Sequence, residues 1–295
     1  MLREIGFLNY RITPHALLFG YAEHAEPKSK GLPGVASAKT GCANGKLGNL
    51  TMKKNGFKNR IREYTNFLRS LFITNYYLIK GMWKLTKLPQ PAVTIFGSSR
   101  LPEDSPYAKS AMALAKKLAL KRFSIITGGG PGIMVSANKG AFEAAKKLNL
   151  KYKDGSKLVY ESSLGIGLTR LTTEKFRNEY IHDYIEMEHF FSRKWLLVRY
   201  ANAFVAFPGG FGTMDELSEV LTLIQTERMK KMPIVLFGKS YWEKLRDFVQ
   251  ENMLKNNLIS QEDRNLITLM TDDVDEAYNT IIEGCKCLGY DENKN

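Results

Sequence analysis

The stretch Phe204-Val-Ala-Phe-Pro-Gly-Gly-Phe-Gly-Thr-Met-Asp-Glu216 joins an apolar run to a glycine-rich turn and then to an amphipathic segment. The apolar run predicts a short buried strand that ends at Pro208, and the glycines after it permit a tight turn. Thr213 is a good N-cap for a helix whose apolar residues recur at helical spacing. Free amides and the positive end of the helix dipole would converge there, which favours a bound phosphate.

The same stretch also fits a purely structural interpretation. No lysine follows the turn as in a Walker loop, and Gly210-Phe-Gly212 lacks the further glycine of a dinucleotide motif, because residue 215 is an aspartate. Thr213-Met-Asp-Glu216 matches a capping box, in which Glu216 only folds back onto the amide of Thr213. The rest of the chain has to distinguish a phosphate site from a capping box.

Length and composition indicate a chain that can bury a full core. It has 295 residues, 44% of them hydrophobic, and no apolar run of the roughly 18 residues that span a bilayer. Its start does not resemble a secretory signal. Three cysteines, Cys42, Cys285 and Cys287, do not make a disulfide framework, and with four scattered histidines they do not predict a metal site. We expect a soluble cytoplasmic protein without metal or cofactor.

The net charge of +13 is concentrated at one end of the chain. Residues 1–90 hold 15 Lys/Arg and 4 Asp/Glu, a net charge of +11. Residues 91–295 hold the other 28 Lys/Arg and 26 Asp/Glu, a net charge of +2. Residues 1–56 show no sustained period and are expected to form a disordered basic extension, with Met52 as a plausible authentic start. Residues 57–88 predict a basic amphipathic helix that packs on the main domain or on a partner subunit, with a membrane surface or nucleic acid as the alternative.

Residues 89–290 alternate between strand and helix patterns after a proline-containing linker. Ser105-Pro106 predicts the start of one helix, and two closing helices are expected near 240–254 and 273–286. The predicted strands are 92–96, 123–127, 162–168, 182–189, 204–207 and 233–237. This alternation predicts an α/β fold with a doubly wound, mostly parallel, Rossmann-like sheet, preceded by the basic extension and helix.

Three polar turns that contain glycine fall at the ends of predicted strands. They are Gly97-Ser-Ser-Arg100, Gly128 to Gly132, and Gly209 to Thr213. Ligands gather at the carboxyl ends of the strands in such sheets. One glycine turn is a weak signal, but three in one sheet indicate a nucleotide-sized ligand that carries a phosphate.

Two adjacent cations, Arg193 and Lys194, stand near the start of a predicted helix that precedes the Phe204 strand. A cation at a helix start opposes the dipole, so a structural purpose for Arg193 is not obvious. In the simpler interpretation both cations are solvated or salt-bridged. In the functional one, Arg193 reaches the cleft of Glu216 and offers a bidentate fork to a phosphate, a sugar or that carboxylate.

Three motifs together resemble the motif set of the LONELY GUY (LOG) family: Gly128-Gly-Gly-Pro-Gly-Ile-Met134, Ser192-Arg-Lys194 and Pro208-Gly-Gly-Phe-Gly-Thr-Met-Asp-Glu216. The members of this family are phosphoribohydrolases that release a free base from a nucleoside 5′-monophosphate, cytokinin precursors and AMP among them, and were long mislabelled as lysine decarboxylases. The resemblance covers about residues 90–285. It implies a homodimer or higher homo-oligomer, with no stable nucleic-acid or membrane partner expected.

By this resemblance, Arg193 and Glu216 match the catalytic residues. Glu216 would stabilise positive charge on the ribose and orient or deprotonate the attacking water, while Arg193 would hold the ribose hydroxyls or Glu216. Asp215 is read as a charge near the helix N-terminus. The implied substrate-binding residues are Ser98, Gly129, Gly130, Gly132, Met134, Lys194, Gly209, Gly210, Gly212 and Thr213.

One segment departs from the family pattern. Many cytokinin-activating members have Met-His-Glu before Arg-Lys, whereas this chain has Phe190-Phe-Ser192, so the resemblance does not imply cytokinin specificity. Two other functions fit the same fold. A non-catalytic nucleotide carrier or sensor, as in related molybdenum-cofactor carriers, is disfavoured by the intact Arg193 and Glu216 pair. A single-stranded nucleic-acid-binding protein is disfavoured by the nearly neutral main domain.

Overall fold

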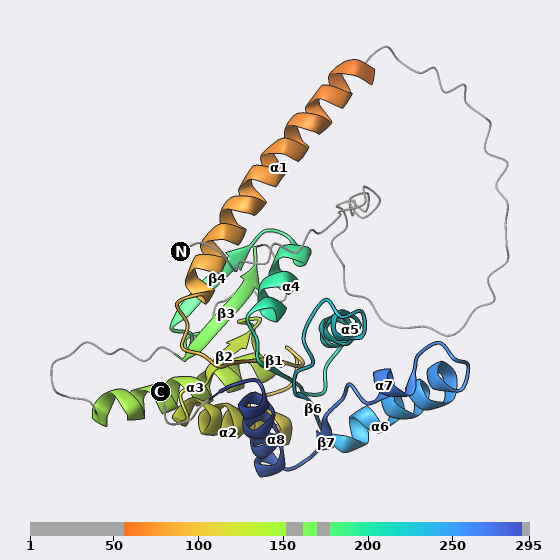
Figure 1. The fold of residues 1–295 in the computed structure, drawn as a ribbon. Helices are drawn as coiled ribbons and strands as arrows, with labels where there is room; N and C mark the ends of the chain where they lie inside the picture. The colour runs from red at the N-terminus through yellow and green to blue at the C-terminus, as the bar shows by residue number, and fades with distance from the viewer. Residues whose placement is uncertain (1–55, 152–161, 170–177, 291–295) are drawn as a thin grey trace, which may run out of the picture. The chain divides into compact units, whose positions relative to one another are not determined.

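The computed structural model describes residues 56–151, 162–169 and 178–290 (Figure 1). These residues belong to one compact unit, Lys54–Asn295. All of the expected basic extension but its last residue lies outside the described ranges, and so do Cys42 and Met52. No helix in the described ranges is long and apolar enough to cross a membrane.

Among the described residues, seven strands form one sheet in which every neighbouring pair is parallel. The strand order is β4-β3-β2-β1-β5-β6-β7. The chain builds one half of the sheet outward from β1 and then returns to build the other half from β5, so the topological switch lies between β1 and β5. The strands are β1 (Ala92–Phe96), β2 (Ser124–Thr127), β3 (Ser163–Leu168), β4 (Asp183–Met187), β5 (Ala203–Ala206), β6 (Ile234–Phe237) and β7 (Leu269–Thr271).

Helices cover both faces of this sheet, which confirms the predicted doubly wound α/β fold. One face is covered by α2, α3 and α8, and the other by α4, α5, α6 and the C-terminal end of α1. A π-helix, Val249–Leu254, continues α6. The helices are α1 (Gly56–Leu85), α2 (Pro106–Leu120), α3 (Ile133–Lys151), α4 (Phe190–Arg199), α5 (Phe211–Gln225), α6 (Lys239–Phe248), α7 (Gln261–Arg264) and α8 (Val274–Cys287).

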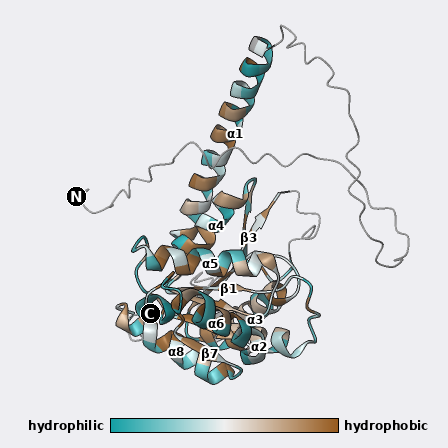
Figure 2. Ribbon diagram, turned by 90° about the vertical axis from the view of Figure 1, so that its right-hand side faces the viewer, coloured by the Kyte–Doolittle hydropathy of each residue, from teal (hydrophilic) through white to brown (hydrophobic). Residues whose placement is uncertain are grey.

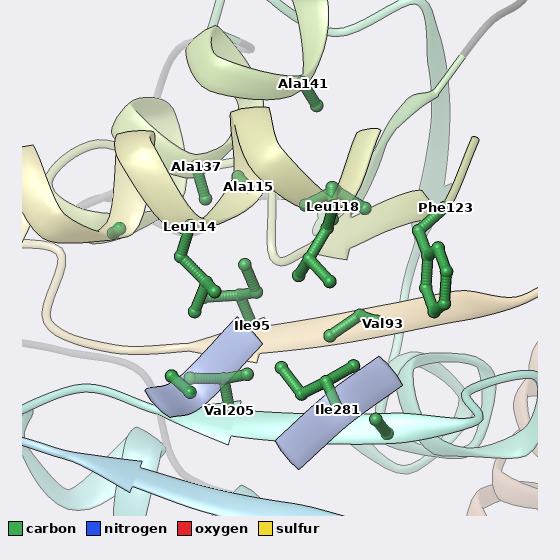
Figure 3. Packing of buried hydrophobic residues seen from close by; sticks show 14 of the residues in the cluster. Val93, Ile95, Leu114, Ala115, Leu118, Phe123, Ala137, Ala141, Val205 and Ile281 are labelled. Carbon is green, nitrogen blue, oxygen red and sulfur yellow. The ribbon is translucent and has the colours of Figure 1, made fainter. Parts of the chain in front are cut away.

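The core on the α2, α3 and α8 face combines branched side chains from the strands with small side chains from the helices (Figure 3). Val93 of β1 and Val205 of β5 meet Leu114 of α2 in this layer. The helices contribute many alanines, so their backbones approach each other closely. A Cβ added to Gly140 of α3 would lie 2.1 Å from the carbonyl oxygen of Met112 in α2. This tight layer fixes where α3 begins, beside the end of β2.

Two predicted helix starts have different outcomes. Ser105 is the N-cap of α2, as predicted, and its hydroxyl accepts the amide of Ala108. The prediction that Thr213 caps α5 is wrong, because Gly210 is the N-cap and Thr213 lies buried in the first turn. Thr213 packs against the preceding turn: a Cβ on Gly209 would lie 2.1 Å from Thr213 Oγ1. A capping box between Thr213 and Glu216 is therefore excluded, since both residues lie inside the helix.

The two cysteines of α8 differ in environment. Cys285 is buried and Cys287 is exposed, and neither forms a disulfide. Burial raises the pKa of the Cys285 thiol to about 12. Cys285 is therefore an unreactive core residue at neutral pH.

Candidate active site

The three predicted glycine turns follow β1, β2 and β5, which are neighbours in the sheet. Ser98 joins all three. Its amide donates to the carbonyl of Pro208 at 3.1 Å, and its own carbonyl accepts the amide of Ile133 at 3.0 Å. We call this hydrogen-bonded unit, formed by residues 97–100, 128–132 and 208–212, the glycine rim. The rim lies at the switch between β1 and β5, where open α/β sheets bind their ligands.

Two glycines of the rim are required by the local backbone and its packing. Gly132 has φ +71°, and a Cβ there would lie 2.3 Å from the carbonyl oxygen of Ser98. Gly129 has φ +78°, and a Cβ there would lie 2.9 Å from the ring of Tyr184. Any other residue at these positions would be strained, and at Gly132 it would also push the turn after β2 away from the turn after β1. The turn after β2 can therefore lie directly against the turn after β1.

Gly210 and Gly212 differ from these two because packing does not require them. Nothing lies within 4 Å of the Cβ position at either residue. Gly210 is the N-cap of α5 and Gly212 lies in its first turn, where the amides of Phe211, Gly212 and Thr213 have no acceptor earlier in the helix. Open space, unblocked backbone and the positive end of a helix dipole therefore coincide at one point. Such an arrangement suits an anion of the size of a phosphate.

Arg193 lies beneath the rim rather than in solvent. Its side chain is buried, its Nε donates to the carbonyl of Ile166 in β3 at 2.9 Å, and its Nη2 donates to the carbonyl of Gly128 at 3.4 Å. A Cβ on Gly128 would lie 2.1 Å from Arg193 Nη2, so the glycine makes room for the guanidinium. The cation that looked misplaced at a helix start therefore connects β3 to the turn after β2.

Glu216 is half-buried on α5, three residues after Thr213 and thus on the same side of the helix. An ion pair between Lys194 of α4 and Asp215 of α5 holds the helix of Glu216 beside the helix of Arg193. Lys194 Nζ lies 2.9 Å from Asp215 Oδ1 and 3.0 Å from Glu219 Oε2. Burial lowers the pKa of Lys194, but the two carboxylates outweigh burial and leave that pKa raised. The structure thus places Lys194 and Asp215 in a contact between α4 and α5.

The remaining predicted residues lie in the turn after β2 or at the start of the helix that follows it. Met134 is buried, and its Sδ lies 2.8 Å from the Cβ position of Gly128. The carbonyls of Gly129 and Gly130 accept from Asn178 Nδ2, at 3.1 Å and 3.5 Å. The structure therefore brings every predicted glycine and Ser98 to one rim, with Met134 beside it in the first turn of α3. In the described ranges, no group of His, Cys, Asp and Glu is arranged to hold a metal ion.

A buried polar network that holds the turn after β2 was missed at the sequence level. Asn138 Oδ1 accepts from Thr127 Oγ1 at 2.7 Å and from Asn178 Nδ2 at 3.1 Å, and Asn138 Nδ2 donates to Ser163 Oγ at 2.9 Å. Thr127 Oγ1 in turn accepts the amide of Gly129 at 3.0 Å. The available signal was Asn138 itself, a polar residue on the apolar side of a predicted helix, because a buried amide needs partners.

A second missed residue contacts the turn after β5 from outside the motif. Tyr241 of α6 donates from its hydroxyl to the carbonyl of Gly209 at 2.5 Å. The ring of Tyr241 packs edge-on against Trp242, which donates to the carbonyls of Ala206 and Phe237 at 3.1 Å and 3.0 Å. The start of α6 therefore supports the rim from behind. No motif in the sequence marks Tyr241 for this contact.

The family model and the curated relatives identify the family of this chain. A family model described as possible lysine decarboxylase matches residues 134–281. A probable cytokinin riboside 5′-monophosphate phosphoribohydrolase of Arabidopsis thaliana is 25% identical over 161 residues, 54% of this chain and 73% of the relative. A pyrimidine/purine nucleotide 5′-monophosphate nucleosidase of Escherichia coli is 30% identical over 154 residues, which cover 50% of this chain but only 32% of that longer protein. The molybdenum cofactor carrier protein of Chlamydomonas reinhardtii is similar in structure, with a TM-score of 0.48, 20% identity, and coverage of 67% of this chain and 99% of the carrier.

Proposed function

Because the chain belongs to the LOG family, whose family model is described as possible lysine decarboxylase, we propose that it hydrolyses the N-glycosidic bond of a nucleoside 5′-monophosphate. The products are a free base and ribose 5-phosphate. The observation that carries this proposal is the open space beside Gly210 and Gly212, at the N-terminus of the helix that bears Glu216. A phosphate seated there puts its ribose within the reach of residues on the same helix.

The phosphate would bind the first-turn amides of α5. Its charge is complementary to the helix N-terminus, and these amides are fixed by the rim before the ligand arrives. Binding energy from the phosphate, which does not react, then positions the anomeric carbon. Because Glu216 lies on the same side of α5 as Thr213, the fixed ribose is held on the carboxylate side of the helix.

The reaction exchanges one bond to the anomeric carbon for another. The bond from C1′ to the base nitrogen breaks while water forms a bond to C1′, and the ribose passes through a state with oxocarbenium character. A carboxylate at Glu216 stabilises that positive charge and orients the water or accepts its proton. The departing base takes up a proton. The reaction needs no cofactor in this scheme.

Arg193 is proposed to act on the sugar side of the site. Its guanidinium is fixed by the carbonyls of Ile166 and Gly128, so it lies at the base of the turn that faces the ribose. A fixed cation there can hold ribose hydroxyls or orient Glu216 without reorganising during the reaction. Lys194 then contributes indirectly, because its pairs with Asp215 and Glu219 keep α4 and α5 together.

The substrate is proposed to be AMP or a nucleotide of the cytokinin riboside monophosphate type. The two relatives are named for different bases, and the segment Phe190-Phe-Ser192 departs from many cytokinin-activating members. The enzyme is further proposed to act as a homo-oligomer in the cytoplasm. Glu216 and Arg193 are proposed to act on the ribose, so their roles in the hydrolysis do not depend on which base the nucleotide carries.

The test is release of ribose 5-phosphate from a panel of nucleoside monophosphates by the purified chain. Wild-type protein is expected to release ribose 5-phosphate and the matching base, and Glu216→Gln is expected to keep AMP binding while turnover falls by about 10²–10⁴. Glu143→Gln makes the same change at a carboxylate of α3 that pairs with Lys116 of α2, so it is the matched control and is expected to retain activity. Binding of AMP by the wild type without any release of adenine would indicate a carrier instead. Undiminished turnover by Glu216→Gln would remove Glu216 from the mechanism.

A further inference from the structure

The two halves of α1 differ in their contact with the rest of the domain. Every described side chain of residues 58–69 is exposed, whereas Thr74 and Leu85 farther along are buried. The second half is anchored through Lys84, which donates to the carboxylate of Asp183. The helix is therefore fixed to the domain at one end, while its other half has no buried side chain among those described.

An apolar stripe runs along α1 on a side other than the buried one (Figure 2). At about 100° per residue its members fall within about 60° of one another, and the centre of the stripe lies about 120–160° around the helix from the buried Thr74, Gly81 and Leu85. Their exposed fractions are 48% to 75%. We call them the α1 stripe: Ile61, Leu68, Phe72, Ile79 and Trp83.

The stripe is larger than the apolar surface that a single chain usually leaves in water. Tyr64, Leu71 and Tyr76 flank it and are also exposed. Together with the stripe they present on the order of 1,000 Å² of side-chain surface. The largest apolar patch on a typical monomer covers about 300–600 Å², and a larger one marks a contact with a protein or a membrane.

Two polar side chains on the same side of α1 hydrogen-bond the backbone of their own helix. Thr65 Oγ1 donates to the carbonyl of Arg62, and Asn75 Nδ2 donates to the carbonyl of Leu71, both at 2.9 Å. A polar group that already has a partner costs less to transfer out of water. The whole side of the helix can therefore enter an apolar medium, and not only its apolar residues.

A row of cations borders the stripe along one edge. At about 100° per residue the members of this row fall within about 40° of one another, next to the edge that ends at Trp83. All are exposed, and within the described ranges none of them pairs with a carboxylate. Long basic side chains beside an apolar face can bury their stems along it and keep their charges in a polar layer. The cation row consists of Lys58, Arg62, Arg69 and Lys80.

The other ionisable groups in and near α1 leave this arrangement intact. Arg60 borders the opposite edge of the apolar side, and Lys84 faces the domain, where it pairs with a carboxylate of β4. Glu63, the only acid of the helix, lies on the side opposite the stripe. Ile185 of β4 packs on α1, so the adjacent Glu186 points to the other face of the sheet. The stripe therefore has cations along both edges and no acid beside it among these groups.

A surface of anionic lipid matches the stripe and the cations together. A nucleic acid would neutralise the cations but leave the stripe in water. A second α1 would cover the stripe but bring no carboxylate to the cation row, because Glu63 lies on the far side of each helix. Phosphate head groups above acyl chains supply both an anionic layer and an apolar layer.

We propose that α1 lies in the head-group layer of an anionic phospholipid bilayer, with the α1 stripe against the acyl chains and the cation row among the phosphates. The helix is about 45 Å long, and it lies along the surface, since it is not apolar enough to cross a membrane. The ring of Trp83 suits the boundary between water and lipid, and Lys87 Nζ, 4.6 Å from its centroid, adds a cation at this end. The resemblance to the LOG family covers about residues 90–285, so α1 lies outside the segment on which the family expectations rest.

The first experiment sediments the full chain with vesicles of phosphatidylcholine alone or mixed with phosphatidylserine. Wild-type protein is expected on the mixed vesicles, with binding that falls as KCl rises. Leu68→Gln/Phe72→Gln, which leaves the charge unchanged, is expected to weaken binding at least about tenfold. Arg62→Gln/Arg69→Gln is expected to weaken it about 25-fold, at about fivefold for each cation.

Two matched variants separate these effects from a general change in the protein. Asn59→Gln/Asn66→Gln alters two exposed polar positions of α1 outside the stripe, and Lys109→Gln/Lys244→Gln removes two exposed cations of α2 and α6. Both are expected to bind the mixed vesicles as wild-type protein does. Wild-type protein that binds neither kind of vesicle would overturn the proposal, as would full binding by Leu68→Gln/Phe72→Gln.

Light scattering without vesicles tests whether a second copy covers the stripe instead. Leu68→Gln/Phe72→Gln is expected to keep the wild-type mass, because the stripe contributes no contact between subunits in this proposal. A lower mass for this variant would assign the stripe to a second copy and overturn the assignment to lipid.

Trp83 allows a measurement at the stripe itself. Its side chain is 66% exposed, whereas Trp195 is half-buried and Trp242 is buried. Mixed vesicles are expected to shift the tryptophan emission to shorter wavelength, and Trp83→Phe is expected to abolish this shift while it still sediments with the vesicles. A shift that persists in Trp83→Phe would place the lipid contact on another surface and contradict the proposal.

Discussion

At the scale of single residues, the hydroxyl of Tyr241 is the contact that most directly controls the proposed phosphate site. It holds the carbonyl of Gly209 from the side of α6. In a planar trans peptide the carbonyl and the following amide point in opposite directions. A carbonyl that is fixed toward Tyr241 therefore turns the amide of Gly210 toward the open side of the rim. Tyr241 thus acts as a positioning residue, through the backbone and without touching the ligand.

We predict that Tyr241→Phe raises the KM for AMP by up to about tenfold with little change in kcat, because one hydrogen bond contributes about 0.5–1.5 kcal/mol. Inhibition by ribose 5-phosphate should weaken to the same extent. Inhibition by adenosine, which has no phosphate, should be unchanged. Steady-state kinetics with both inhibitors, together with a thermal unfolding curve to show an intact fold, test this. Equal loss of affinity for adenosine would mean that Tyr241 supports the whole site and not the phosphate turn.

At the scale of elements, the glycine rim combines two kinds of glycine that a matched pair of substitutions can separate. Gly132→Ala puts a Cβ 2.3 Å from the carbonyl oxygen of Ser98 at a residue with φ +71°. We therefore predict that it lowers the free energy of unfolding by about 1–3 kcal/mol. Gly210→Ala meets no atom within 4 Å and has φ −93°, so its cost is within about 1 kcal/mol. That methyl group instead enters the space proposed for the phosphate, and the KM for AMP should rise.

Urea unfolding and AMP kinetics of the two variants distinguish these effects. The expected pattern is a stability defect for Gly132→Ala and a binding defect for Gly210→Ala. An unchanged KM in Gly210→Ala would show that the phosphate binds elsewhere, even if the rim is correctly described. Equal instability in both variants would contradict the assignment of separate roles.

The elements that sequence patterns predicted are those whose cause is local. The strands before each glycine turn and the Ser105 cap follow from apolar runs and turn residues a few positions apart. Thr213 was wrongly predicted as an N-cap because its actual position depends on packing against Gly209, which no propensity reports. β7 was missed because a strand of three residues has too little pattern to recognise.

The parts of the site that were missed depend on partners distant in the sequence. Tyr241 contacts Gly209 across 32 residues, and Asn178 contacts Asn138 across 40. Without the sheet order there is no reason to bring these residues together. The motif glycines could be found because each turn is a local signal, whereas the groups that fix those turns could not.

At the scale of the whole molecule, the positive charge is concentrated in the N-terminal third of the chain. The part of the chain that holds the rim is nearly neutral, with a net of +2 over residues 91–295, while residues 1–90 carry +11. The proposed anionic substrate would therefore rely on a local feature, the helix N-terminus, and not on a broad positive surface. Long polyanions should be attracted mainly to the N-terminal third.

We predict that the chain binds single-stranded oligonucleotides weakly and without sequence preference, through its N-terminal third. Removing residues 1–53 takes away seven Lys/Arg, so the slope of log affinity against log salt should fall by up to about 5, at about 0.7 for each cation that neutralises a phosphate of a single strand. Fluorescence anisotropy over a series of KCl concentrations measures the slope for the full chain and for residues 54–295. Both chains should hydrolyse AMP equally well, with or without the oligonucleotide, because residues 1–53 include no residue of the proposed nucleotide site. An unchanged slope after truncation, or competition between the oligonucleotide and AMP, would place the polyanion surface on the catalytic domain and contradict this division of charge.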